Sequence, residues 1–139
     1  MNPNLMLWPL VIHALVTLAL YIPMSRARIS TVKHGKVKGG VYKLNQGEPE
    51  ESLRFSNAIR NQNESGVIFY AGVLSAYASH NVGYLLLLLA WAFVIVKTVH
   101  VYVHVTTNNL RHRRPVFTVA YFLLIALWVV FAIQLTGLL

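Results

Sequence analysis

The sequence predicts an all-α membrane protein, folded as a bundle of four transmembrane helices. Of its 139 residues, 56% are hydrophobic and only 12% are charged, and the mean hydropathy is +0.55. Soluble domains carry about 25% charged residues, so lipid must replace water as the solvent for much of this chain. The apolar content excludes a disordered chain, and the length fits a single domain, residues 1–139.

Four segments are long enough to cross a bilayer, whose hydrocarbon core of about 30 Å takes about 20 helical residues. We expect the spans at about residues 5–24, 54–78, 82–106 and 115–138. The first resembles an anchor more than a secretory signal, because no positive residue precedes it and no small-residue cleavage site ends it. Pro9 and Pro23 lie near its ends, where a kink or a stop is tolerated.

The remaining segments differ in how apolar they are. The second span is polar over residues 54–64 and apolar afterwards, so a hydropathy window would miss it. The third is strongly apolar but carries basic residues in its last third. A basic turn over residues 107–114 precedes the fourth span, and Pro115 suits the first turn of a helix. Between the first two spans, residues 25–53 predict a helix extension and then an irregular, glycine-rich cytoplasmic loop.

Positive charge is confined to two places. The 12 Lys and Arg residues are Arg26, Arg28, Lys33, Lys36, Lys38, Lys43, Arg54 and Arg60 in or beside the first loop, and Lys97, Arg111, Arg113 and Arg114 at or beside the third. Under the positive-inside rule, both termini face outside and loops 1 and 3 face the cytoplasm. The net charge of +8 is therefore mostly a topology signal, and we expect no nucleic-acid partner.

Two stripes of polar residues lie within the predicted spans. They consist of Asn57, Asn61 and Glu64 on the second helix, and of Lys97, His100, His104 and Asn108 on the third. The spacing puts each set on one helix face, and Arg60 can pair with Glu64 four residues later. Ionisable residues in a span are costly unless they face protein or water. We therefore expect the stripes to face each other, within a chain or across a subunit boundary, around a polar cavity with the arginines of loop 3 at its mouth.

Plainer interpretations stay open for several of these residues. Arg54, Lys97, Arg111 and Arg114 can reach the lipid headgroups, and Asn61 with Glu64 can join helices by hydrogen bonds. His13 stands alone in the first span, either as a hydrogen-bonded core residue or as a pore-facing one.

A metal site is a weaker hypothesis. His100 and His104 have an i, i+4 spacing that can hold a metal, with Glu64 as a third ligand. A second carboxylate or a third histidine is missing nearby, so we expect no metal. The absence of cysteine excludes Cys-ligated metal sites and a thiol nucleophile of the protein's own.

Several short motifs, taken in order, resemble the MAPEG superfamily, membrane-associated proteins in eicosanoid and glutathione metabolism, and most closely its small bacterial branch. The motifs are Arg26-Ala-Arg28 after the first span, Asn61-Gln-Asn-Glu64 near the start of the second, Ala90-Trp-Ala-Phe93, and the stretch from Lys97 through Arg113. The resemblance covers essentially the whole chain.

The resemblance implies a homotrimer in a bacterial inner membrane, with active sites between neighbouring subunits near the cytoplasmic face. Glutathione would bind there as cofactor, and a lipophilic small-molecule substrate would enter laterally from the membrane lipids. By position, Arg113 matches the residue that stabilises the glutathione thiolate. The residues implied to bind the cofactor are Arg28, Arg54, Arg60, Asn61, Glu64, His100 and His104.

We therefore expect a glutathione-dependent transferase or peroxidase acting on lipophilic electrophiles. A guanidinium near the sulfur favours its thiolate form, and Glu64 can accept the α-amino group. Asn57 stands where the family commonly has Arg, and Phe117 where some members have a Tyr that bonds the thiol. These departures leave a second hypothesis open, a non-enzymatic lipid-binding or accessory membrane subunit of the same fold.

Overall fold

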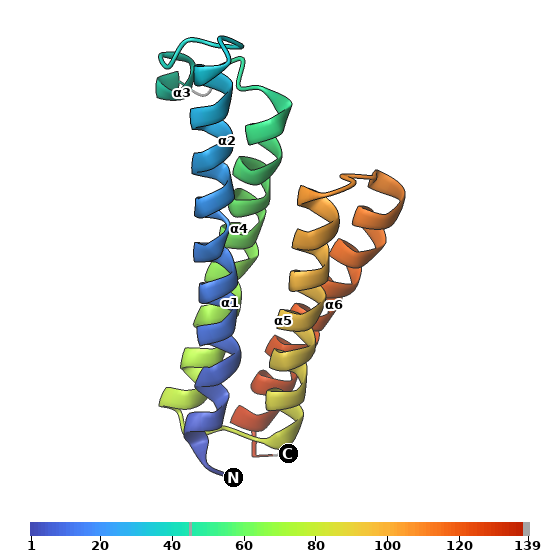
Figure 1. Cartoon of the computed structure of the whole chain (residues 1–139). Coiled ribbons are helices and arrows are strands. Elements are labelled where there is room, and N and C mark those ends of the chain that lie inside the picture. Colours follow the sequence, from blue (N-terminus) through green and yellow to red (C-terminus); the bar gives the residue numbers. More distant parts are fainter. Residues whose placement is uncertain (45, 138–139) are drawn as a thin grey trace.

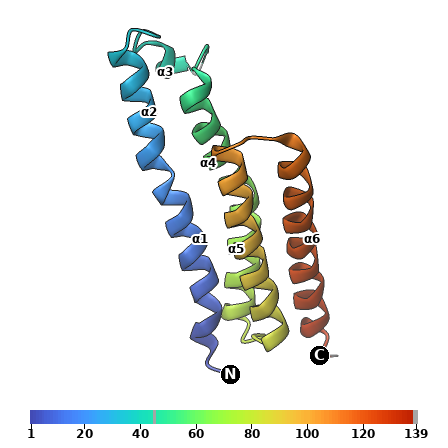
Figure 2. The same ribbon diagram turned by 45° about the vertical axis from the view of Figure 1, so that its right-hand side comes forward.

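The computed structural model describes residues 1–44 and 46–137, and every regular element in that part is a helix (Figure 1). In chain order the elements are η1 (Pro3–Met6), α1 (Leu7–Ala19), α2 (Tyr21–Lys33), α3 (Val41–Leu44), α4 (Glu50–Ala78), α5 (Tyr84–Val105) and α6 (Leu110–Leu135). The all-α prediction is confirmed. Four long helical segments, which we call arms, lie side by side. The first is α1 continued by α2, and the others are α4, α5 and α6 (Figures 1 and 2).

Three of these arms are long and apolar enough to cross a membrane. They are Pro3–Lys33, Tyr84–Val105 and Leu110–Leu135. Helix α4 falls short by the same measure because its first half is polar, as the sequence indicated. A fourth transmembrane span at α4 therefore stays a prediction.

The regular helix is interrupted at Leu20, where α1 passes into α2. The ring nitrogen of Pro23 has no hydrogen to donate to the carbonyl of Ala19, so the helix hydrogen-bond ladder is interrupted near Leu20. Helix α2 then runs on to Lys33, which is the helix extension expected after residue 25. Helix α4 starts at Glu50, and the acidic side chains of Glu50 and Glu51 suit the positive end of its dipole.

Helix α6 starts earlier than expected, at Leu110 instead of at Pro115. Asn109 caps it, because its side-chain Oδ1 accepts from the backbone nitrogen of Arg111 at 2.9 Å. Its backbone oxygen accepts from Arg113, also at 2.9 Å. Pro115 therefore lies inside the helix, where it forgoes only the bond to the carbonyl of Arg111. The expected end near residue 138 lies outside the described residues.

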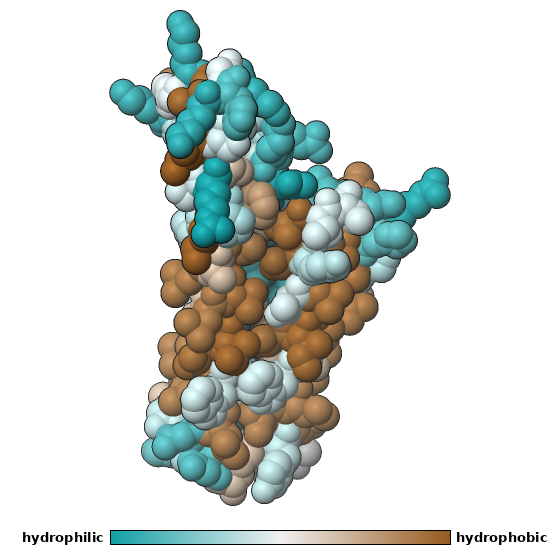
Figure 3. Space-filling view, viewed as in Figure 1, coloured by the Kyte–Doolittle hydropathy of each residue, from teal (hydrophilic) through white to brown (hydrophobic). Residues whose placement is uncertain are grey.

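The core is apolar over most of its length. Phe69 of α4 and Phe93 of α5 stack with ring centroids 4.5 Å apart at its centre. Around this stack pack Met6, Val73, Ala76, Leu86, Ala90, Val94, Ala120, Leu124, Leu127 and Phe131. The outer surface along the arms is also apolar, as the brown area in Figure 3 shows. An apolar exterior around an apolar core is typical of a protein that lies in lipid.

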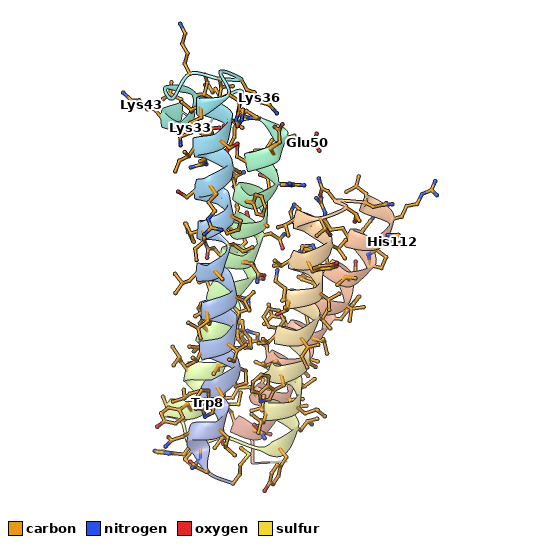
Figure 4. All side chains as sticks on the ribbon, viewed as in Figure 1. Trp8, Lys33, Lys36, Lys43, Glu50 and His112 are labelled. Atoms are coloured by element: carbon orange, nitrogen blue, oxygen red, sulfur yellow. The ribbon has the colours of Figure 1, made fainter. Side chains whose placement is uncertain are left out.

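The two ends of the bundle differ in charge. Lys33, Lys36, Lys43 and Glu50 gather at one end, whereas Trp8 and both termini lie at the other (Figures 1 and 4). We call the first the basic end; it carries the loop between α2 and α4 and the turn between α5 and α6. Hydrophilic side chains cover it in Figure 3.

An ion pair fastens the long loop at the basic end. The guanidinium of Arg28 on α2 donates from Nε to Glu48 Oε1 at 2.9 Å and from Nη2 to Oε2 at 3.2 Å. Ser56 of α4 bonds both partners. Burial raises the pKa of Glu48, but its hydrogen bonds with Arg28, Ser52 and Ser56 outweigh burial and hold the pKa below the usual value. The contact joins α2, the loop and α4.

Candidate functional site

A pocket of about 310 Å³ opens where α4, α5 and α6 meet, toward the basic end. Its walls are formed by Asn61, His100, His104, Leu110, Arg113, Arg114 and Phe117. Four residues expected at the site thus come together: one from α4, two from α5 and one from α6. The two polar stripes do face each other, at Asn61 and the α5 histidines.

The contact between the stripes is made by Lys97 and Asn61. The ammonium of Lys97 donates to Asn61 Oδ1 at 2.9 Å and to the backbone oxygen of Asn61 at 3.2 Å. Lys97 is only 1% exposed, so its side chain does not reach the headgroups, which was one interpretation of the sequence. The bond from Lys97 fixes how the Asn61 amide is turned, and the amide nitrogen is a donor with no hydrogen-bond partner among the described residues.

Two buried histidines form the α5 wall. The rings of His100 and His104 meet edge to face with centroids 5.6 Å apart, and Phe117 of α6 tilts against His100 at 5.7 Å. The Nδ1 atom of His104 is buried and finds no hydrogen-bond partner among the described residues. Because buried polar atoms are almost always bonded, this atom is a candidate contact for a ligand.

Arg113 is positioned by the turn between α5 and α6. Its Nη1 donates to Asn108 Oδ1 at 2.6 Å. Asn108 has a φ of +48°, in the left-handed region that Asn tolerates better than most residues. Its backbone nitrogen donates to the carbonyl of Val103 at 2.8 Å, which ends α5. The remaining donors of the Arg113 guanidinium are left for the pocket.

The other residues expected at the site do not line this pocket. Arg28 is held by Glu48 and Ser56, as described above. Arg54 lies over the ring of Phe55 with its guanidinium carbon 5.2 Å from the centroid, and its buried Nε has no partner among the described residues.

Arg60 and Glu64 are exposed on α4. The ion pair expected between them is not formed: in the part of the chain that is described, the ion pairs are Arg28–Glu48 and Lys36–Glu51. An exposed pair of this kind gains little to hold two long side chains together. Nor do any three described His, Asp or Glu residues lie where they could hold a metal.

Sequence reasoning missed Leu110 as a wall residue; it expected Arg114 at the mouth of the cavity, and the resemblance placed Phe117 where some members have a Tyr that bonds the thiol. Positions 110, 113, 114 and 117 share one helix face, so their spacing was a usable signal. It was hidden because the turn was expected to continue to residue 114, whereas the Asn109 cap starts α6 before these residues.

Comparison with known proteins gives one match. The sequence model described as the MAPEG family matches residues 6–133. No curated protein and no solved structure matches the chain.

Proposed function

The chain belongs to the MAPEG family, and we propose that it is an integral membrane, glutathione-dependent transferase or peroxidase that acts on lipophilic electrophiles. The observation that carries this proposal is the pocket in which Asn61, His100, His104 and Arg113 meet. Family membership alone leaves the activity open, so the chemistry of the pocket has to support the choice.

The pocket suits an anion rich in hydrogen-bond acceptors. Arg113 and Arg114 are its charged wall residues, and no acidic side chain of the described residues lines it. Asn61 adds an amide donor beside them. The two carboxylates and the sulfur of glutathione fit such a donor set. When bound, glutathione would supply the thiolate that attacks the electrophile, and Arg113 would hold negative charge at that sulfur.

A single chain offers only part of such a site. A volume of about 310 Å³ is at the lower end of the range of about 300–1,000 Å³ for ligand pockets. The glutathione ammonium needs an acceptor, and Glu64 lies outside the pocket on the exposed face of α4. Both facts support a site completed by a second copy of the chain.

The exposed face of α4 supports the same conclusion. Arg60, Asn63 and Glu64 are exposed there, followed by Val67 at 69% exposure. Lys97 of a candidate membrane span bonds Asn61, so this part of α4 lies at membrane depth. Polar groups at that depth are costly in lipid. We therefore propose a homotrimer in which neighbouring chains cover α4, which makes α4 the fourth transmembrane helix of the bundle.

The substrate would enter from the bilayer. An apolar groove of about 370 Å³ lies between α4 and α6 and is lined by Ile68, Tyr121, Leu124, Ile125, Trp128, Val129 and Ala132. Tyr121 is one helical turn from Phe117, which lines the pocket. A lipophilic molecule in the groove would therefore lie close to the pocket that contains Arg113. We place the basic end in the cytoplasm of a bacterial inner membrane by the positive-inside rule.

A thermal-shift titration with glutathione tests the proposal on the detergent-solubilised oligomer. Binding to the folded state must raise the unfolding midpoint as ligand increases, and we expect this at millimolar glutathione. The second hypothesis, a non-enzymatic lipid-binding subunit, is favoured by Phe117, a ring without a hydroxyl in the pocket wall. No shift with glutathione while the oligomer stays intact would support that hypothesis instead.

A further inference from the structure

Three helices bring buried polar side chains to two neighbouring helical turns of the bundle, next to the central phenylalanine stack. These side chains are His13 and Thr17 on α1, Gln62 on α4 and Lys97 on α5, and we call them the polar layer. Their exposures are 1%, 7%, 0% and 1% in that order. Four polar residues so fully buried in an otherwise apolar core require a physical explanation.

Packing contacts place the α1 and α4 members of the layer. His13 lies against Gly66, where its Cε1 would be 3.1 Å from an added Cβ, so a larger residue at position 66 would have to displace the ring by a few tenths of an ångström. The hydroxyl of Thr17, one turn along α1, donates to the His13 carbonyl at 2.9 Å. Gln62 lies one turn before Gly66 on α4. Since α1 and α4 run in opposite directions (Figures 1 and 2), Thr17 and Gln62 fall at the same level.

Lys97 completes the layer from α5. Phe93 stacks on His13 with centroids 5.7 Å apart, and Lys97 follows Phe93 by one helical turn. Both of its hydrogen bonds go to Asn61, the residue next to Gln62. The third hydrogen of its ammonium has no acceptor among the described residues, and the ion pairs of the described residues do not include Lys97.

Several atoms of the layer lack partners. Both polar atoms of the Gln62 side chain, Nε2 and Oε1, are buried without a hydrogen bond to any described residue, and so is Nε2 of His13. The other ring nitrogen of His13 bonds the hydroxyl of Tyr70 at 2.8 Å. Native proteins leave few such atoms unsatisfied, and ordered water is the commonest partner where protein groups are missing.

The mixture of unsatisfied donors and acceptors identifies the missing partner. A bound anion would accept from Lys97 and from the Gln62 amide nitrogen, but it would face Oε1 of the same amide. A bound cation would be repelled by Lys97. Water both donates and accepts, and can serve the ammonium, both ends of the amide and the imidazole.

We propose that the polar layer is an internal binding site for ordered water. The water joins Lys97, Gln62 and His13 in one hydrogen-bond network. Asn61 belongs both to this network, through Lys97, and to the wall of the pocket. The layer therefore connects Asn61 in the pocket wall, by hydrogen bonds, to the His13–Tyr70 pair in the middle of the bundle. The proposal does not depend on glutathione binding.

Replacing Gln62 by methionine tests the proposal, because the two side chains have similar length and methionine lacks both polar atoms. If water fills the layer, Gln62→Met removes two of the water's hydrogen-bond partners, and we expect the thermal unfolding midpoint to fall by several degrees. If the layer is dry, the substitution removes two unsatisfied polar atoms, and a raised or unchanged midpoint would overturn the proposal. Gln46→Met, at an exposed loop position, is the matched control and should leave the midpoint unchanged.

A direct measurement covers the case in which the variant fails to fold. In water-edited solid-state NMR of the wild-type protein in vesicles, magnetisation from water should reach the side-chain amide of Gln62 and not the ring of Phe69. No transfer to Gln62 would overturn the proposal. So would a wild-type midpoint that depends on chloride against sulfate at constant ionic strength, because that result would identify an anion in the layer.

Discussion

The ammonium of Lys97 on α5 donates to both oxygens of Asn61 on α4, at 2.9 Å to Oδ1 and 3.2 Å to the backbone oxygen. This contact ties α4 to α5, which is one of the candidate membrane spans. It also fixes how the Asn61 amide is turned, because Oδ1 is held toward Lys97. A buried cation on one helix thus sets the hydrogen-bonding character of a pocket residue on another.

Lys97→Met should weaken glutathione binding about tenfold, or about 1.4 kcal/mol. Methionine fits the buried site but cannot hydrogen-bond Asn61 Oδ1. The Asn61 amide can then rotate, so its nitrogen is no longer fixed toward the ligand. The dissociation constant can be measured by calorimetry on the detergent-solubilised protein. Thr98→Val, at an exposed position beside Lys97, is the control. An unchanged constant in Lys97→Met would show that the orientation of Asn61 does not matter.

His104→Leu should separate ligand binding from stability. The Nδ1 atom of His104 is buried and unsatisfied within the described residues, so an apolar replacement should leave the unfolding midpoint unchanged or raise it. The rise in midpoint that glutathione produces should shrink. His112→Ala, exposed in the first turn of α6 (Figure 4), should change neither quantity. A large loss of stability in His104→Leu without ligand would argue for a structural histidine.

The Arg28–Glu48 contact should make stability depend on pH on the acid side. The pKa of Glu48 lies below its usual value of 4.5 in the folded protein. The contact therefore contributes fully above that unfolded value, and its contribution is lost as the pH falls through the lower folded pKa.

Glu48→Gln should accordingly destabilise the protein by about 2 kcal/mol at neutral pH, and the difference from wild type should shrink below about pH 4.5. Denaturation curves at several pH values measure both effects. Glu51→Gln breaks the exposed pair with Lys36 and should cost at most about 1 kcal/mol. A difference that does not vary with pH would contradict the ionic character of the Glu48 contact.

Oxidative cross-linking tests whether a second copy covers α4. The chain has no cysteine, so any disulfide that forms must involve the single introduced thiol. Val67→Cys lies beside the exposed Arg60–Glu64 face and should form disulfide-linked dimers when the membrane-embedded protein is oxidised. Leu88→Cys, 64% exposed on α5, should form few. Equal cross-linking of both variants would mean random collision and would remove the support for an α4 interface.

Much of this architecture could be predicted from local patterns. Helix periodicity put Asn61 on one face of α4 and His100 with His104 on one face of α5, and the cost of polar groups in lipid predicted that these faces would meet. Such reasoning works because both rules act on single helices or on pairs of them.

Other features depended on contacts that no local pattern reveals. The start of α6 was misplaced because Pro115 is a strong helix-start signal, whereas the Asn109 cap acts one turn and a half earlier. Lys97 has a side chain long enough to reach the headgroups, and only the position of Asn61 shows that it turns inward. The role of Glu64 remains a prediction because its proposed partners lie on a ligand and a neighbouring chain.

Whether Arg113 holds glutathione as its thiolate can be read from the ultraviolet absorbance of the bound thiolate. At neutral pH, saturating glutathione should produce this absorbance with the wild-type protein and with Arg111→Gln, whose side chain lies outside the pocket. It should be lost in Arg113→Gln even when calorimetry shows that glutathione still binds. Equal thiolate absorbance in Arg113→Gln and wild type, or none in the saturated wild-type protein, would show that Arg113 does not hold glutathione as its thiolate.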